Sequence, residues 1–206
     1  YAVWATRIRV FRHYRSQLAP TSGSMGYGLP AAVAAAAVHP DRTVVCFAGD
    51  GCFLMTGQEL ATAVQYGLRL VVLVVNNGMY GTIRMHQERE YPTRVSGTEL
   101  RNPDFAALAR AYGAFGARVE RTADFPAALD EALAFEGPAL LELALAPEAL
   151  TVRASLSQLR DAALVSGHPR APGEVHESAR AQQRRGEATR DQRGARVTTV
   201  DPIGKH

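Results

Sequence analysis

Residues 44–51 read VVCFAGDG, and residues 70–78 read LVVLVVNNG. Each stretch is a valine-rich apolar run that ends abruptly in small and polar residues. The runs do not alternate with polar residues, which is typical of strands in a parallel sheet covered on both faces. We therefore predict two buried strands, over residues 43–48 and 70–75, with helices on both faces of the sheet.

The chain around these strands alternates between helical and extended patterns. Helices are predicted over residues 31–38, 58–66, 105–112 and 124–135, and further strands over residues 117–120 and 139–145. Gly67 and Gly113 stand where a helix commonly ends in a left-handed residue. Strands separated by helices of about ten residues predict right-handed βαβ units. The expected fold class is α/β, a three-layer, doubly wound, mostly parallel sheet.

The net positive charge of the chain comes from its C-terminal part. The first 150 of the 206 residues contain 13 basic and 14 acidic residues, whereas the last 56 contain 10 basic and 6 acidic ones. Residues 161–206 are rich in Arg, Gln, Gly and Glu and lack a sustained apolar period, so we predict a disordered Arg-rich tail. We prefer a solvated tail to a nucleic-acid-binding arm, because no aromatic residue lies among these basic ones.

Composition excludes several classes of protein. The two cysteines, Cys46 and Cys52, are too few for a disulfide-rich scaffold and lack the spacing of a zinc site. No apolar run reaches the length of about 18 residues that spans a membrane, and residues 1–15 lack the apolar core of a signal peptide. We therefore expect a cytoplasmic protein. Because the chain begins with Tyr1, we interpret it as a fragment, with residues 1–16 a remnant of a linker or preceding segment and 17–160 the folded domain.

Polar residues follow both predicted strands at the point where each ends. Ligands of open parallel sheets bind beyond these carboxyl ends, so the two turns would meet if the strands are neighbours. Asp50 offers a carboxylate oxygen and Asn77 an amide oxygen, which suit Mg²⁺ with phosphate and water as further ligands. Gly51 allows a phosphate to approach the backbone, and the following helix would point N–H groups at it. Either turn alone is usually structural; together they predict a metal-held diphosphate.

The Gly-Asp-Gly of residues 49–51, followed after 24 residues by Asn76 and Asn77, resembles the thiamine-diphosphate-binding motif. Residues 22–30, SGSMGYGLP, resemble the matching turn of acetolactate synthase and benzoylformate decarboxylase relatives. The resemblance covers residues 17–159. It implies the thiamine-diphosphate-binding fold, with thiamine diphosphate and Mg²⁺ as cofactors.

The resemblance also implies roles for individual residues. Asp50, Asn77 and the carbonyl of Met79 would bind the metal, and Asn76 would shape the turn. The backbone of Gly51 and Cys52 would bind the diphosphate. Met25 would support the bent cofactor, with Gly23 beside it under the pyrimidine ring. The implied cofactor-binding set is Gly23, Ser24, Met25, Gly49, Asp50, Gly51, Cys52, Asn77, Met79 and Tyr80. No catalytic residue is expected in this chain, since the activating glutamate of the family lies in a separate N-terminal domain.

The activity implied is that of a 2-oxo-acid carboligase resembling acetolactate synthase, which transfers the decarboxylated fragment to a second carbonyl. Alternatives are a decarboxylase resembling benzoylformate decarboxylase, a non-catalytic binding module and, well below these, a nucleic-acid adaptor. Implied partners are a 2-oxo acid, the N-terminal pyrimidine-binding domain and further subunits of a homo-oligomer, with no membrane. The segment 79–91 would cover the cofactor entrance, with Tyr80, Ile83, His86 and Gln87 as candidates to face the substrate or a partner domain. The chain alone is expected to be inactive.

Overall fold

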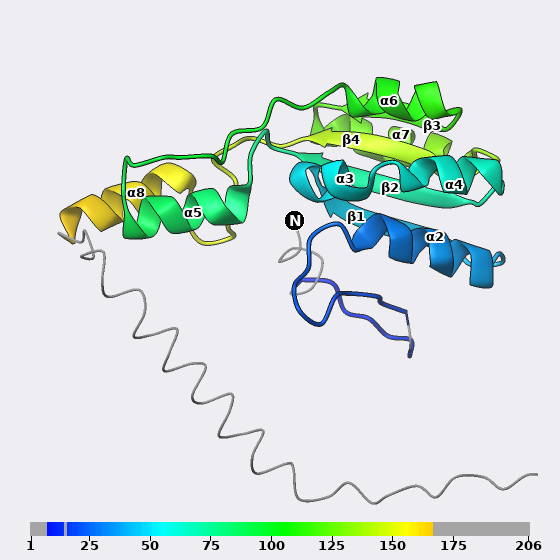
Figure 1. Ribbon diagram of the computed structural model, residues 1–206, viewed down its shortest axis with the longest axis horizontal. Helices are drawn as coiled ribbons and strands as arrows, with labels where there is room; N and C mark the ends of the chain where they lie inside the picture. Colours follow the sequence, from blue (N-terminus) through cyan, green and yellow to red (C-terminus); the bar gives the residue numbers. More distant parts are fainter. Residues whose placement is uncertain (1–7, 15, 167–206) are drawn as a thin grey trace, which may run out of the picture. The chain divides into compact units, whose positions relative to one another are not determined.

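The computed structural model describes residues 8–14 and 16–166. A four-stranded parallel sheet has the order β1-β2-β4-β3 (Figure 1). The strands are β1 (Val44–Gly49), β2 (Leu70–Asn76), β3 (Phe115–Val119) and β4 (Ala139–Ala144). Because Val44 pairs with Leu70 and Gly49 with Val75, β1 and β2 are neighbours that end side by side. The predicted α/β fold with a parallel sheet is confirmed.

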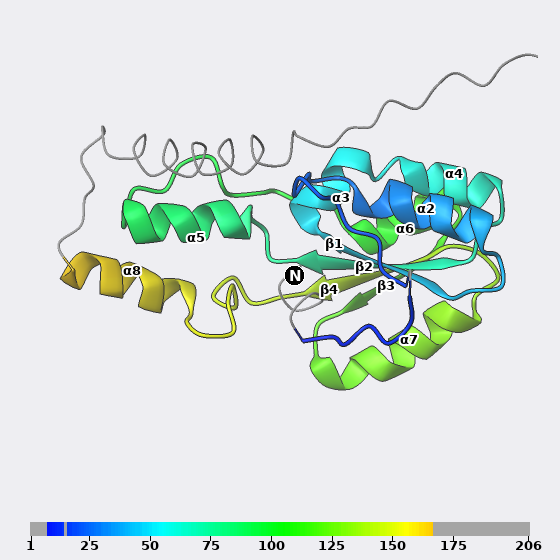
Figure 2. The ribbon, with the colours of Figure 1, turned by 90° about the horizontal axis from the view of Figure 1, so that it is seen from below.

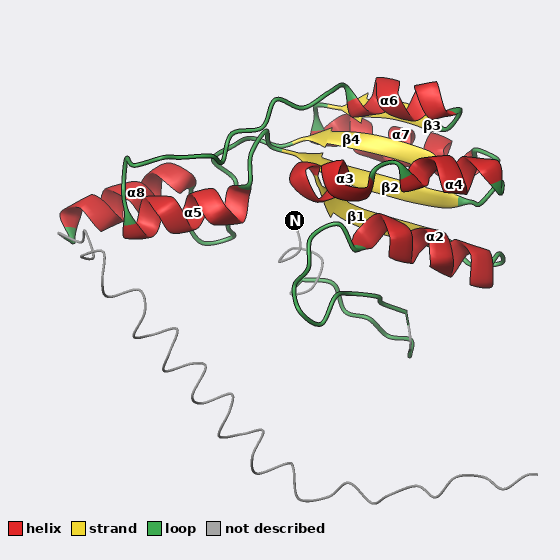
Figure 3. Ribbon diagram, viewed as in Figure 1, coloured by secondary structure: helices red, strands yellow, loops and turns green. Residues whose placement is uncertain are grey.

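The helices alternate with the strands along most of the chain (Figure 3). They are α2 (Gly28–Val38), α3 (Asp50–Thr56), α4 (Glu59–Gln65), α5 (Gly81–Glu90), α6 (Phe105–Tyr112), α7 (Phe125–Ala134) and α8 (Leu156–Val165), with a short 3₁₀ turn, η1 (Thr122–Asp124). Helix α6 has the predicted bounds: the Asp104 side chain caps its start, and Gly113 ends it in the left-handed region at φ 89°. In the described part of the chain, no helix is long and apolar enough to cross a membrane.

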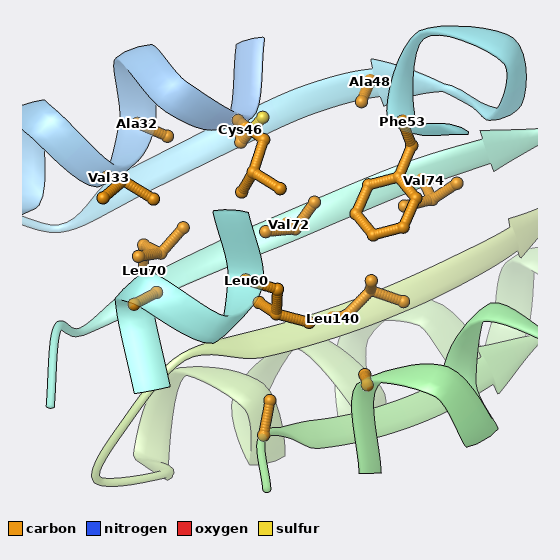
Figure 4. Close-up of a cluster of buried hydrophobic side chains, with 14 of the residues drawn as sticks. Ala32, Val33, Cys46, Ala48, Phe53, Leu60, Leu70, Val72, Val74 and Leu140 are labelled. Carbon is orange, nitrogen blue, oxygen red and sulfur yellow. The ribbon is translucent and has the colours of Figure 1, made fainter. Parts of the chain in front are cut away.

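Helices α2, α3, α4 and α6 cover one face of the sheet (Figure 2). Their apolar side chains pack on those of β1, β2 and β4, which forms the larger core (Figure 4). Phe53 of α3 and Phe105 of α6 meet edge to face, with ring centroids 5.4 Å apart. This packing places the start of α3 at the carboxyl ends of β1 and β2, where the predicted site lies.

Helix α7 covers the other face, but only in part. Its side chains pack on residues of β2, β3 and β4, among them Val71, Leu73 and Leu141. On β1, Val45 and Phe47 remain 41% and 43% exposed. The prediction that helices cover both faces therefore holds for β2, β3 and β4, and is wrong for β1 within the described residues, because α7 packs on the other three strands.

Helix α8 corrects the predicted start of the tail. Residues 161–165, which the sequence assigned to the disordered tail, continue this helix to Val165. Ser155 and Gln158 form a reciprocal capping box at its first turn. Leu156 and Ala163 are buried, and the helix packs against α5 (Figure 2). An apolar stripe too short to stand out in the sequence is thus stabilised by a cap and a partner helix. The remaining predicted tail, residues 167–206, and residues 1–7 of the predicted remnant lie outside the described residues.

Candidate functional site at the carboxyl edge of the sheet

The turns that follow β1 and β2 meet at one edge of the sheet, as predicted. Asp50 is the first residue of α3, and Asn76 is the last of β2. The backbone N–H of Gly78 donates to Asp50 Oδ2 at 2.8 Å, which joins the two turns directly. Gly78 takes a left-handed conformation, at φ 68°, that glycine adopts without strain. The pairing of β1 with β2 therefore brings the candidate metal ligands together.

Asp50 is a buried carboxylate with an uneven set of partners. The residue is 3% exposed. Its Oδ2 accepts two hydrogen bonds, from Gly78 N–H at 2.8 Å and from Asn102 Nδ2 at 2.9 Å. Its Oδ1 accepts one, from the N–H of Gly51 at 2.8 Å. A carboxylate oxygen has about two lone-pair sites, so Oδ1 is the oxygen with room for a further partner.

The two neighbouring asparagines have different surroundings. The Asn76 side chain donates to Glu142 Oε1 at 2.9 Å and accepts from Asn102 Nδ2 at 2.8 Å and from Gly78 N–H at 3.1 Å. This amide is engaged on both sides, which agrees with the prediction that Asn76 shapes the turn. Asn77 Oδ1, by contrast, accepts a longer bond of 3.3 Å from Met79 N–H. Asn77 is thus the asparagine with the more available oxygen.

Met79 is held in an isolated antiparallel bridge with Glu99. The hydrogen bonds of this bridge run between the flanking residues: Tyr80 N–H donates to Thr98 O, and Leu100 N–H donates to Gly78 O, each at 2.9 Å. In this register the carbonyl of Met79 itself points away from Glu99. The predicted main-chain ligand is therefore not used by the bridge that positions it.

Gly51 has a packing role that the sequence did not reveal. A Cβ at this position would lie 2.5 Å from Cε1 of Tyr80, so the ring packs directly over the glycine. The N–H of Gly51, predicted to hold a phosphate, donates to Asp50 Oδ1. Gly49 precedes the helix in an extended conformation, and Cys52 in its first turn is half-buried. The structure thus places Gly49, Gly51, Cys52 and Tyr80 beside Asp50.

The predicted pyrimidine-side residues lie at the other end of α3. Thr56, the last residue of that helix, donates through its hydroxyl to Gly26 O at 2.8 Å, which ties the segment of residues 22–26 to the helix. Ser22 and Ser24 share a hydrogen bond of 2.7 Å, and Gly23 takes a left-handed φ of 71°. A helix of this length spans about 10 Å. A ligand that touches both Asp50 and this turn must therefore be elongated.

A shallow groove of about 570 Å³ adjoins this turn. It is lined by Leu18, Ser24, Met25, Gly26, Tyr27, Pro30, Ala31, Ala34 and Thr56. Met25 and Tyr27 are 40% and 38% exposed, respectively. Most of the lining is apolar, which suits the face of a ring rather than a charged group.

Three further residues, Asn102, Glu142 and Arg118, were not predicted from the sequence but belong to the same hydrogen-bond network. Asn102 lies just before α6 and contacts both Asp50 and Asn76. Glu142 on β4 is fully buried and is paired with Arg118 of β3 at 3.0 Å. A glutamate within the otherwise apolar strand ALLELA was a signal in the sequence, whereas Asn102 carried none.

The predicted entrance segment forms α5 and makes its own contacts. His86 Nδ1 lies 2.7 Å from Arg89 Nη2, and Gln87 exchanges two hydrogen bonds with the backbone of Ser96. Ile83 is 50% exposed. His86 is exposed as well, so the side chains of both Ile83 and His86 remain open to a partner or substrate.

The described residues contain no group of three or more His, Cys, Asp or Glu side chains that could hold a metal. The candidate site instead combines one carboxylate with amide and carbonyl oxygens. The nearby thiol of Cys46 is a core residue: burial, with a smaller effect of Cys52, raises its pKa to about 12. Cys46 therefore stays protonated at neutral pH.

The family comparison agrees with this geometry. A family model described as thiamine pyrophosphate enzyme, C-terminal TPP binding domain, matches residues 1–143. The large subunit of acetolactate synthase isozyme 2 from Escherichia coli (strain K12) is 43% identical over 124 residues, which are 60% of this chain and 23% of the relative. Acetolactate synthase from Arthrospira platensis is 42% identical over 123 residues, which are 59% of this chain and 21% of the relative.

Solved structures of two decarboxylases are similar to this chain. Benzoylformate decarboxylase from Polynucleobacter necessarius aligns with a TM-score of 0.58 and 34% identity, over 62% of this chain and 25% of that one. The thiamine diphosphate-dependent 4-hydroxybenzoylformate decarboxylase of Rhodococcus jostii aligns with a TM-score of 0.59 and 37% identity, over 62% of this chain and 24% of that one. This chain thus spans about a quarter or less of each of these relatives. With a match over most of its length, the chain belongs to the thiamine pyrophosphate enzymes and corresponds to their C-terminal cofactor-binding domain.

Proposed function

We propose that this domain binds thiamine diphosphate, also called thiamine pyrophosphate, through Mg²⁺ held by Asp50, Asn77 and the carbonyl of Met79. The observation that carries the proposal is the arrangement at Asp50, where Oδ2 is used by two donors and Oδ1 keeps room for a cation. One carboxylate, one amide and one carbonyl oxygen fit Mg²⁺, which takes its other ligands from phosphate and water.

The rest of the domain supports an elongated ligand. The start of α3 would face the diphosphate, with the backbone of Gly51 and Cys52 nearest to it. Gly51 N–H would have to exchange its bond to Asp50 Oδ1 for one to phosphate. At the far end of α3, the apolar groove around Met25 would support the ring portion of the cofactor.

The whole protein would be a 2-oxo-acid carboligase, as the acetolactate synthases among its relatives suggest. When bound, the cofactor supplies the carbon nucleophile and electron sink for decarboxylation. This chain would orient it by holding the metal and supporting the ring. The exposed groove favours completion of the site by an N-terminal pyrimidine-binding domain, within a homo-oligomer, that contributes the activating glutamate. The 206-residue chain alone would be inactive.

The direct test is calorimetry of thiamine diphosphate binding to the full chain with Mg²⁺ or with EDTA. We expect binding only with Mg²⁺, and its loss in Asp50→Ala. Asp41→Ala, which removes an exposed carboxylate, is the matched control and should bind like the wild type. Metal-independent binding, or equal binding by Asp50→Ala, would contradict the proposal.

A non-oxidative decarboxylase is the second candidate, because both solved structures described above carry that activity in their names. Product analysis separates the two: the longer protein that contains this domain, given a 2-oxo acid, would release a free aldehyde if it is a decarboxylase. A carboligase would give a product that joins the fragment to a second carbonyl compound. We expect the joined product to dominate.

A further inference from the structure

A connected series of polar side chains leads from the middle of the sheet to Asp50. It begins at Glu142, which is fully buried on β4. The Glu142 carboxylate accepts hydrogen bonds from Arg118 Nη1 at 3.0 Å, from Phe105 N–H at 3.0 Å and from Asn76 Nδ2 at 2.9 Å. An ionised carboxylate only accepts hydrogen bonds, so the Asn76 amide must turn its NH₂ group towards Glu142.

The orientation of Asn76 sets that of Asn102. With its NH₂ group on Glu142, Asn76 presents Oδ1 to Asn102 Nδ2 at 2.8 Å. The same Nδ2 atom donates to Asp50 Oδ2 at 2.9 Å. Among the described residues, Asn102 Oδ1 is buried and lacks a hydrogen-bond partner. Flipping the amide would place this oxygen against two acceptors, so Asn76 and Asp50 together fix the amide in one orientation.

The result at Asp50 is a carboxylate with two distinct oxygens. Asn102 and the Gly78 N–H occupy Oδ2, which leaves Oδ1 to face a cation with a single competing donor, Gly51 N–H. We propose that Asn102 is a positioning residue of the metal site, because its hydrogen bond to Oδ2 makes Asp50 a one-oxygen ligand. Glu142 in turn sets the orientation of the Asn76 and Asn102 amides. This inference rests on the proposed function, because it assumes that Asp50 binds a cation.

One-oxygen binding has a consequence for the choice of cation. Mg²⁺ requires compact octahedral geometry, whereas Ca²⁺ accepts both oxygens of a carboxylate and a larger number of ligands. If Asn102 is removed, Oδ2 loses a donor and becomes available to a cation. Mg²⁺ should then bind more weakly, because the Asp50 carboxylate is held less firmly. Ca²⁺ loses the same support but gains Oδ2 as a ligand oxygen, which offsets the loss. A role limited to stability would weaken both cations alike.

The experiment uses the full chain labelled with ¹⁵N and trace Mn²⁺ as the probe. Bound Mn²⁺ broadens the amide signals nearest to it, and we expect this at Gly51 and Gly78. Added Mg²⁺ or Ca²⁺ reverses the broadening, and the concentration required measures the affinity of each. In Asn102→Ala we expect the required Mg²⁺ concentration to rise about tenfold, as for one lost hydrogen bond to a charged group. The Ca²⁺ concentration should change less than threefold.

Two further variants complete the design. Asp104→Ala removes the cap of the same helix, α6, without touching Asp50, and should bind like the wild type. Asn102→Ser is milder, keeps one hydroxyl donor and should shift Mg²⁺ binding in the same direction by about threefold. If Asn102→Ala does not give the dispersed NMR spectrum of a folded chain, Asn102→Ser takes its place in the test. Unchanged Mg²⁺ binding, or an equal loss for Mg²⁺ and Ca²⁺, would overturn the inference. Absence of broadening in the wild-type chain would instead overturn the proposed function, and the inference with it.

Discussion

The ring of Tyr80 lies over Gly51 so closely that a Cβ at position 51 would come within 2.5 Å of Cε1 and 2.8 Å of Cδ1. The two residues follow different strands, since Gly51 is in the first turn of α3 and Tyr80 immediately precedes α5. Their contact therefore joins the two turns that carry the candidate metal ligands. The glycine of the Gly-Asp-Gly motif is required here by a neighbouring aromatic ring, whatever its role towards a phosphate.

Gly51→Ala should destabilise the domain by about 1–3 kcal/mol, the usual cost of an overpacked site. The cost arises because the added methyl group displaces the Tyr80 ring. In the background of Tyr80→Ala, the same substitution should cost less than about 0.5 kcal/mol, because the nearest remaining neighbour is then Leu100 Cδ1 at 3.4 Å, close to ordinary van der Waals contact. Urea unfolding of the four proteins measures both values. An equal cost in the two backgrounds would show that the Tyr80 ring is not the reason for the glycine.

The carboxylate of Glu88, a residue that is only 1% exposed, links α5 to the residues packed around it. It pairs with Arg84 at 3.0 Å, accepts from the N–H of Thr93 at 3.1 Å and lies 3.9 Å from Arg160 of α8. Thr93 has a positive φ of 67°, which is unusual for a β-branched residue. One buried carboxylate thus holds a strained backbone position and faces the partner helix.

Glu88→Ala should expose α8 to local opening, because Arg160 of α8 loses its contact with Glu88 and Arg84 is left without its buried partner in the helix on which α8 packs. Removing one member of a buried pair costs about 3–5 kcal/mol. We expect hydrogen exchange to become faster over residues 156–165, while the strands keep their protection. Glu90→Ala is the control, since a more exposed pair contributes about 0–1 kcal/mol. Unchanged exchange in α8 after loss of Glu88 would contradict this account of the contact.

The burial of Cys46 predicts both its reactivity and a pH effect on stability. Burial raises the pKa of this thiol from 9.0 to about 12. In a Cys52→Ser variant, iodoacetamide at pH 8 should therefore leave the native chain unlabelled and react only after unfolding. A raised folded-state pKa also means that the stabilisation is complete below pH 9 and is lost as the pH rises towards 12. Stability should fall more steeply above pH 9 in the wild type than in Cys46→Ala. Rapid labelling of the folded Cys52→Ser chain would disprove the assignment of Cys46 to the core.

The sequence was most informative where periodicity and turn chemistry agree. The apolar runs predicted β1 and β2, and Gly113 at the end of a helical pattern over residues 105–112 agrees with the bounds of α6. Helix α5 was missed because its ten residues, GTIRMHQERE, include one buried residue, Glu88, so there is no apolar stripe to detect. Within the helix, Glu88 pairs with Arg84, and Glu88 also lies 3.9 Å from Arg160 of α8, on which α5 packs. The contacts with α8 are tertiary, so the residues of α5 alone do not reveal them.

The candidate site was predicted in part for the same reason. The strand ends placed Asp50 and Asn77 at one edge of the sheet, since parallel neighbours share their carboxyl ends. Asn102 reaches Asp50 from 52 positions further along the chain. That contact depends on how α6 packs on the sheet. The sequence also did not predict that one face of β1 is partly exposed, because an apolar strand predicts burial. In the structure, Val45 and Phe47 on that face are not covered by any described helix.

The central claim is that Asp50, Asn77 and Met79 hold the metal of a thiamine diphosphate site. The most direct measurement is an anomalous difference map from crystals of the full chain grown with thiamine diphosphate and Mn²⁺ in place of Mg²⁺. We predict one strong peak at coordination distance from Asp50 Oδ1, Asn77 Oδ1 and the Met79 carbonyl oxygen. A peak bound elsewhere, or cofactor bound without a metal at Asp50, would contradict the account.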